Sequence, residues 1–344
     1  MPKADAPTGG KPGRTSGPAI DDKPASQLDS AGGGDPGRVS ILDTGTDLDE
    51  AYEFVNGCWY GPQGTGKTTD LAAMAHLGKV IYINAEGGLK RKPLKKLGIP
   101  VENITVLPQK PEQLTYEWLE ELYWELSELL ERDPDAIAGV AWDSITEIHK
   151  VLLRNVSVYQ NERAKRRGES RLKNAAPGDI LNDAFTDLSD YGIMADQMRL
   201  MLRRYRDLPC HFAVSALERR DVDDDGRVVY RPAVTPALIN DLLGFMDVVA
   251  HTSTKEFDDD GDEEYQGLFR PIGKYRGKDR FKSLPPHLVD PTFLRVVQYV
   301  NDDIELDTDD VMQAALERRG GAKRIKSDAP VAQATAEEAE PASE

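Results

Sequence analysis

The chain has 344 residues, 39% of them hydrophobic, which suits one large α/β domain or two small ones. Its formal net charge of -17 excludes a protein that coats duplex DNA through bulk charge attraction, so any nucleic-acid contact has to come from local basic patches. Two cysteines, Cys58 and Cys210, are too few for a disulfide framework and indicate a reducing compartment. The sequence contains no apolar stretch of about 18 residues and no apolar leader, so we expect a cytoplasmic protein without a membrane span or signal peptide.

The two ends of the chain differ in composition from the middle. Residues 1–44 are rich in Gly, Pro, Ser and Asp, and residues 321–344 are rich in Ala, Pro and Glu. Segments of this kind bury too little apolar surface to offset the entropy cost of ordering. We therefore predict a disordered N-terminal arm, one folded domain over residues 45–320, and a disordered acidic tail.

A glycine-rich loop follows the first predicted strand, residues 54–60, and precedes a predicted helix, residues 69–77. The loop fits the spacing G-x-x-x-x-G-K-[ST], in which glycines let successive backbone N–H groups point at phosphate oxygens and the helix adds its positive N-terminal end. We expect Lys67 to reach the β- and γ-phosphates of a nucleotide and the Thr68 hydroxyl to ligate Mg²⁺. The predicted phosphate-binding residues are Gly61, Pro62, Gln63, Gly64, Thr65, Gly66, Lys67, Thr68 and Thr69. The alternative is a glycine-rich turn that fits the spacing by chance.

Two later predicted strands lead into a carboxylate, Glu86 after residues 79–84 and Asp143 within residues 138–144. In open α/β sheets, ligands bind beyond the carboxyl ends of the strands, so both acids are expected near the phosphate loop. Glu86 then orients or deprotonates the attacking water, unless it is only an exposed loop acid. Asp143 holds Mg²⁺ directly or through water, unless it only caps the helix predicted for residues 145–156.

Several further elements follow from apolar periodicity. The predicted strands are 104–107, 210–216 and 243–251, and the predicted amphipathic helices are 111–132, 191–205 and 308–318. Ser215 lies at the carboxyl end of its strand, where a polar side chain is placed to sense a γ-phosphate. Residues 221–226 and 258–263 begin like calcium loops, but Pro232 and Gly267 stand where a bidentate glutamate is required, so we interpret both segments as acidic turns.

Three basic segments interrupt the acidic chain, at residues 90–96, 163–173 and 270–282. The first is typical of a solvated face, with a nucleic-acid contact as the alternative. The second is either a mobile loop that contacts single-stranded nucleic acid or the exposed end of the preceding helix. In the third, bases alternate along a predicted strand end and loop, which indicates either cations that protrude toward another subunit's phosphates or an edge strand kept soluble by charge.

With these residues in place, the chain resembles the RecA-like recombinase core, and among such proteins the short phage-encoded RecA-like ATPases. Residues 81–86 are similar to the family's strand ending in D-A-E, whose glutamate activates water, and residues 141–144 are similar to its V-D-S at the metal. Residues 277–280 resemble its K-x-K segment, which implies that Lys278 and Arg280 act on the ATP of a neighbouring subunit. The resemblance implies a P-loop core with a mostly parallel sheet flanked by helices, together with ATP and Mg²⁺ as ligands.

The resemblance also implies an activity: slow ATP hydrolysis coupled to single-stranded DNA binding and to annealing or homologous recombination. The implied partners are single-stranded DNA, further copies of the chain in a ring or filament and a single-strand-binding protein, in the cytoplasm of a bacterial host. Ser215-Ala216 stand where the family has an Asn-Gln pair, so the likeness in ATP binding does not extend to ATP-gated strand exchange. Two alternatives remain, namely a loading or packaging factor that acts on a protein partner and a nucleotide-binding protein with little turnover.

Overall fold

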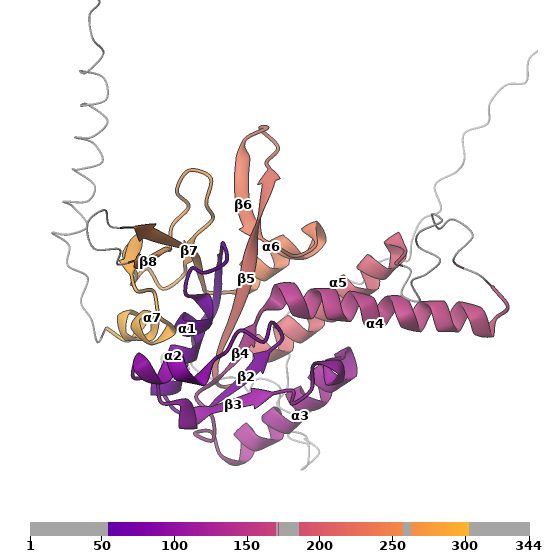
Figure 1. Cartoon of the computed structure of the whole chain (residues 1–344), viewed down its shortest axis with the longest axis horizontal. Helices are drawn as coiled ribbons and strands as arrows, with labels where there is room; N and C mark the ends of the chain where they lie inside the picture. Colours follow the sequence, from indigo (N-terminus) through magenta and orange to yellow (C-terminus); the bar gives the residue numbers. More distant parts are fainter. Residues whose placement is uncertain (1–53, 170, 172–185, 257–262, 303–344) are drawn as a thin grey trace, which may run out of the picture. The chain divides into compact units, whose positions relative to one another are not determined.

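The computed structural model describes residues 54–169, 171, 186–256 and 263–302 (Figure 1). The strands are β1 Asn56–Gly61, β2 Val80–Asn84, β3 Ile104–Leu107, β4 Gly139–Asp143, β5 His211–Val222, β6 Val228–Pro232, β7 Val248–Glu256, β8 Glu263–Leu268, β9 Lys278–Asp279 and β10 His287–Val289. The α-helices are α1 Lys67–Ala72, α2 Arg91–Lys96, α3 Tyr116–Arg132, α4 Ile145–Arg166, α5 Leu188–Arg206, α6 Pro236–Phe245 and α7 Phe293–Val300. The predicted arm (1–44), acidic tail (321–344) and last helix (308–318) lie outside the described residues.

One sheet organises the described part of the chain, in the order β10-β8-β7-β1-β5-β4-β2-β3. The six strands from β7 to β3 run parallel, whereas β8 and β10 add antiparallel strands beyond β7. This arrangement confirms the predicted α/β class with a mostly parallel sheet flanked by helices. Because β1 lies in the interior of the sheet, the loop that follows it emerges at the shared carboxyl edge of the parallel strands.

Alternating side chains along the central strands divide the core between the two faces of the sheet. Cys58 and Tyr60 of β1 pack in one apolar cluster with α3, α4, α5 and α6, whereas Trp59 packs in the other with α1, α2 and α7. Val140 and Trp142 of β4 likewise face the first cluster, and Ala141 faces the second. The central strands are therefore buried on both faces, which is why their sequences read as continuous apolar runs.

The long helices begin at side-chain caps. Thr115 accepts a hydrogen bond from Trp118 N–H at the start of α3, and Ser144 accepts one from Glu147 N–H at the start of α4. The methionines of α5, Met194, Met198 and Met201, are fully buried in the first cluster, as predicted for core packing.

Several predicted boundaries are wrong. The helix after the glycine loop is α1 followed by a 3₁₀ turn, Ala73–His76, and α4 continues through the first part of the basic segment 163–173. The strand predicted for 243–251 begins only at Val248, because Thr235 and Pro236 start a helix that includes Leu243. The acidic turn predicted at residues 221–226 joins β5 to β6, with Gly226 in the left-handed region at φ 76°. The second acidic turn, 258–263, falls almost entirely outside the described residues.

Among the described residues, no helix is both long enough and apolar enough to cross a bilayer.

The close approach of β4 to β5 gives a stability prediction. A Cβ atom added at Gly139 would lie 2.5 Å from the backbone oxygen of His211 and 2.5 Å from Met74 Sδ. Because the backbone of a central strand moves little, Gly139→Ala should lower the free energy of unfolding by about 1–3 kcal/mol, measured by denaturant titration. The matched control is Gly192→Ala in α5, where nothing lies within 4 Å of the added Cβ, and it should raise that free energy by about 1 kcal/mol. Equal stability of the two variants would contradict the prediction.

Candidate phosphate-binding site at the carboxyl edge of the sheet

The glycine loop joins β1 to α1 and forms one wall of a pocket of about 650 Å³. Gly64 and Gly66 both have φ 80°, a conformation in which glycine is strongly favoured, and Asp70 N–H donates to Gly66 O at 2.9 Å to close the first helical turn. Seven residues of the predicted set, Gln63 to Thr69, line the pocket. Gly61 and Pro62 do not line the pocket, and their backbone carbonyls accept hydrogen bonds from Lys67.

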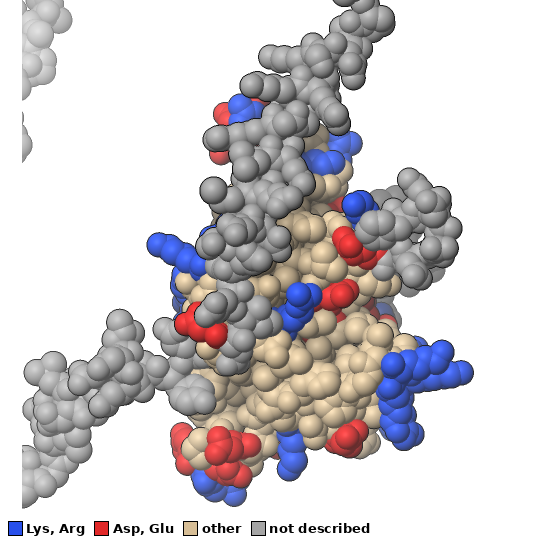
Figure 2. All heavy atoms as spheres, turned by 90° about the vertical axis from the view of Figure 1, so that its left-hand side faces the viewer, with Lys and Arg blue, Asp and Glu red and all other residues tan. Residues whose placement is uncertain are grey.

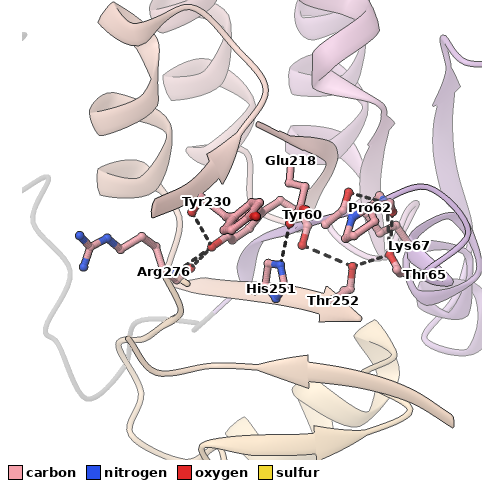
Figure 3. Close-up of polar contacts among 10 residues, drawn as sticks. Tyr60, Pro62, Thr65, Lys67, Glu218, Tyr230, His251, Thr252 and Arg276 are labelled. Carbon is pink, nitrogen blue, oxygen red and sulfur yellow. Dashed lines mark hydrogen bonds and ion pairs between the residues drawn. The ribbon is translucent and has the colours of Figure 1, made fainter. Parts of the chain in front are cut away.

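The Lys67 side chain folds back over its own loop (Figure 3). Its Nζ donates to Gly61 O at 3.1 Å, to Pro62 O, and to Thr65 Oγ1 at 3.3 Å. Burial lowers the pKa of Lys67, while the carboxylates of Glu86 and Asp143 oppose that shift. A buried ammonium satisfied only by neutral oxygen atoms is well placed to exchange them for an anion that enters the pocket.

Strand β7 supports the loop from the side. Thr252 Oγ1 lies 2.8 Å from Thr65 Oγ1 and donates to Tyr60 O at 3.3 Å (Figure 3). A Cβ atom on Gly61 would collide with Thr252 O, so glycine is required there for close packing of β1 against β7. No local signal identifies Thr252, because Tyr60, whose carbonyl accepts its hydrogen bond, is 192 residues away in the chain.

Asp143 collects hydrogen bonds from three elements and is 1% exposed. Its Oδ2 accepts from Thr68 Oγ1 at 2.8 Å and from the Tyr82 hydroxyl at 2.9 Å, and its Oδ1 accepts from the Ser215 hydroxyl. Burial, and then the Asp143 carboxylate, raises the pKa of Tyr82 well above its usual value, so this hydroxyl remains a donor. The hydroxyl and carboxylate pair of Thr68 and Asp143 is an oxygen donor set that fits Mg²⁺.

Glu86 lies beside this cluster, as its position after β2 predicts. Its Oε1 accepts a hydrogen bond from Ser144 Oγ at 2.6 Å, and its backbone N–H donates to Asp143 O at 3.1 Å. Glu86 lines the same pocket as the loop. The structure thus brings Lys67, Thr68, Glu86 and Asp143 into one pocket.

Ser215 is fully buried and lies behind Asp143 rather than on the pocket wall. In this arrangement its hydroxyl orients the carboxylate, and direct contact with a γ-phosphate stays a prediction.

Lys278 and Arg280 lie at the other edge of the sheet. Strand β9 pairs with the start of β7, beside the start of β1, so both side chains are at the amino edge of the parallel strands. Lys278 Nζ donates to the carbonyls of Leu243 and Met246 at 2.9 and 2.6 Å, and Arg280 pairs with Asp247. The structure therefore does not bring Lys278 and Arg280 to the pocket of their own chain. The strand along which the basic residues of segment 270–282 were expected to alternate is limited to the two residues of β9.

Comparison with known families accounts for this geometry. A family model described as an AAA domain matches residues 53–281, more than half of the chain. The chain belongs to the AAA domain family. The match begins just before β1 and covers the glycine loop, Glu86, Asp143 and β9, so all of the predicted site residues lie inside the AAA domain. A comparison with the curated proteins found no match.

Sequence reasoning missed five residues that line the AAA domain's pocket: Ala85, Glu147, Lys150, Leu217 and Tyr265. Glu147 and Lys150 occupy the first two turns of α4, and their three-residue spacing in a helix that begins just after Asp143 was a signal that could have found them. Tyr265 belongs to β8, and its ring lies about 3 Å from the position of a Cβ on Gly66. No local pattern identifies Tyr265, because it reaches the loop through the antiparallel pairing of β8 with β7. The described residues contain no group of three or more His, Cys, Asp or Glu side chains that would hold a metal alone.

The hydrogen bond from Ser215 to Asp143 predicts a cation effect. In Ser215→Ala, Asp143 Oδ1 loses its donor and the carboxylate is less firmly oriented, so the Mg²⁺ concentration needed for half-maximal nucleotide binding should rise by about tenfold. The measurement is a Mg²⁺ titration at fixed nucleotide concentration. Ser157→Ala is the matched control, since it removes another buried hydroxyl, bonded to Leu153 O in α4 and away from the pocket. An unchanged Mg²⁺ midpoint in Ser215→Ala would show that the residue has no part in orienting Asp143.

Proposed function

We propose that this AAA domain protein binds ATP with Mg²⁺ and hydrolyses it slowly. The observation that carries the proposal is the convergence, in one pocket, of the Lys67 ammonium, the Thr68–Asp143 pair and the Glu86 carboxylate. By themselves, the AAA domain and its glycine loop support nucleotide binding but not hydrolysis. A carboxylate that lines the same pocket adds a group able to accept the proton of an attacking water.

In the proposed reaction each residue of the chain has a distinct task. Lys67 exchanges its contacts with Gly61 O and Pro62 O for phosphate oxygens, and the loop N–H groups bind the remaining phosphate charge. Thr68 and Asp143 hold Mg²⁺, which when bound neutralises charge that develops on the phosphates. Glu86 orients water and takes its proton as the oxygen–phosphorus bond forms and ADP leaves. The Ser144 hydroxyl holds Glu86 in place through its 2.6 Å hydrogen bond.

Tyr265 is the proposed contact for the base of the nucleotide. Its ring lies against Gly66 at the side of the pocket formed by β8, away from Glu86, and an aromatic face accepts any purine by stacking. The phosphates then point from Tyr265 across the loop toward Glu86.

These roles predict different effects for two substitutions. Lys67→Ala should abolish measurable ATP binding and hydrolysis, because the phosphates lose their buried cation. Glu86→Gln should keep nucleotide affinity within a few-fold and lower kcat by about 10²–10⁴-fold, because the general base is lost. Equilibrium binding and a phosphate-release assay provide the two measurements. Normal hydrolysis by Lys67→Ala would disprove the assignment, and an unchanged kcat in Glu86→Gln would show that Glu86 is not the general base.

Single-stranded DNA is the proposed partner, in annealing or recombination. The supporting observation is a pair of half-buried rings, Tyr230 on β6 and Tyr275 in the loop before β9, with centroids 5.5 Å apart. Lys274 Nζ lies over both rings, at 4.9 and 5.3 Å from their centroids. Aromatic faces combined with cations suit bases and phosphates of a single strand. Figure 1 shows the β5–β6 hairpin extending past the body of the sheet, where a strand has access to it.

A protein partner, as for a loading or packaging factor, is the second candidate. The net charge of -17 favours it, and Figure 2 shows the Lys and Arg side chains of one face in separate groups with uncharged surface between them. A continuous basic groove is the usual requirement for tight sequence-independent binding of a nucleic acid.

Oligonucleotide binding distinguishes the two candidates. A labelled single strand should bind the full chain at low salt and release at higher salt, with a stronger signal when ATP is present. Lys274→Ala should weaken binding and reduce its salt dependence, whereas Lys110→Ala, an exposed lysine outside this loop, should not. Absence of binding at low salt would overturn the nucleic-acid proposal and leave the protein partner.

A further inference from the structure

Two charged residues of the pocket have no part in the proposed reaction. Glu147 and Lys150 line the same pocket as the glycine loop and Glu86, and both come from the start of α4. Their position is fixed by Ser144, whose Oγ donates to Glu86 and accepts from Glu147 N–H at 3.3 Å. The first turns of α4 are therefore tied to the carboxylate proposed to activate water.

The order of strands determines which end of a nucleotide meets these residues. Tyr265 comes from β8, on one side of β1, whereas Glu86, Asp143 and α4 follow β2 and β4 on the other side. The glycine loop lies between the two groups. A nucleotide with its base at Tyr265 and its phosphates on the loop consequently directs its terminal phosphate toward Glu86 and Lys150.

Among the charged side chains of the pocket, Lys150 is a cation suited to bind that phosphate. Three carboxylates, those of Glu86, Asp143 and Glu147, line the pocket with two lysines, Lys67 and Lys150. Lys67 is at the loop. Lys150 Nζ lies 3.0 Å from Glu147 Oε2, in a pair whose side chains are 58% and 36% exposed. Because solvent already screens an exposed ion pair of this kind, little free energy is lost when Lys150 exchanges the Glu147 carboxylate for a phosphate oxygen.

We propose that Lys150 binds the γ-phosphate within the same chain and that Glu147 holds its ammonium when no γ-phosphate is present. The pair then sets the preference of the pocket for a nucleoside triphosphate over a diphosphate. The inference rests on the proposed function, since it assumes that the pocket binds a nucleotide. A diphosphate ends on the loop and does not reach α4, so its affinity is independent of Lys150.

The same helix supplies a matched control. Arg166 and Glu162 form an ion pair at the other end of α4, at 3.7 Å and with side chains 82% and 57% exposed, and neither lines the pocket. If Lys150 only contributes an ion pair on a helix surface, Lys150→Gln and Arg166→Gln should behave alike.

The experiment measures the affinity of the full chain for ADP and for a non-hydrolysable ATP analogue, both with Mg²⁺. Lys150→Gln should weaken binding of the analogue by about tenfold, the effect of one charge-assisted contact, and leave ADP within twofold. Lys150→Arg should restore most of the preference for the ATP analogue over ADP. Glu147→Gln frees the ammonium and should strengthen binding of the analogue relative to ADP. Arg166→Gln should change neither affinity.

Equal effects of Lys150→Gln on ADP and on the analogue, or no effect on either, would overturn the inference. Lys67→Ala separates this failure from that of the proposed function. If Lys67→Ala abolishes binding of both nucleotides while Lys150→Gln changes nothing, only the role of Lys150 is wrong. If the unmodified chain binds neither nucleotide, the proposed function fails and the inference fails with it.

Discussion

The Asp143 carboxylate is the interaction on which the arrangement of the pocket depends. It is buried at the end of β4 and accepts hydrogen bonds from Thr68 on α1, Tyr82 on β2 and Ser215 on β5. A buried carboxylate needs such donors, because an unpaired charge in the interior is costly. The same contacts join the glycine loop to three neighbouring strands, so the requirement to satisfy one charge also fixes the relative positions of the groups proposed to bind phosphate and to activate water.

A second set of contacts connects the loop to the opposite side of the sheet. Thr252 contacts both Thr65 and Tyr60, and its neighbour His251 has Nε2 2.8 Å from Glu218 Oε2 at the base of the β5–β6 hairpin (Figure 3). Burial lowers the pKa of His251 while Glu218 opposes the shift, so at neutral pH the ring is uncharged and its Nε2–H donates to the carboxylate. The ring also stacks on Tyr275 at 3.9 Å between centroids. These contacts form a short polar route from the glycine loop to the hairpin that carries Tyr230.

Local signals in the sequence were sufficient for the β1–loop–α1 unit and for the two carboxylates at strand ends. In each case a short segment determines both the element and the end at which its polar residue lies. What the sequence did not reveal includes contacts that depend on pairings between distant segments. Tyr265 reaches Gly66 only because β8 folds back on β7, and Ser215, although its strand end was predicted, contacts Asp143 only because β5 lies beside β4. Helix α6 was mistaken for strand at its end because the apolar residues from Leu242 to Met246 fit both periods, and only the cap at Thr235 and Pro236 distinguishes them.

The location of Lys278 and Arg280 bears on how copies of this chain would associate. A side chain at the amino edge of the sheet cannot serve the pocket at the carboxyl edge of its own chain. It meets a pocket only if the amino edge of one copy faces the carboxyl edge of the next, which is a head-to-tail contact that closes into a ring or continues as a filament. Arg280 is the better suited of the two for such a contact, because its side chain is 56% exposed, whereas Lys278 is occupied by the carbonyls at the end of α6. An anion from a neighbouring copy would have to compete with Asp247 for Arg280, so a role in another subunit's site requires that ion pair to open as the subunits assemble.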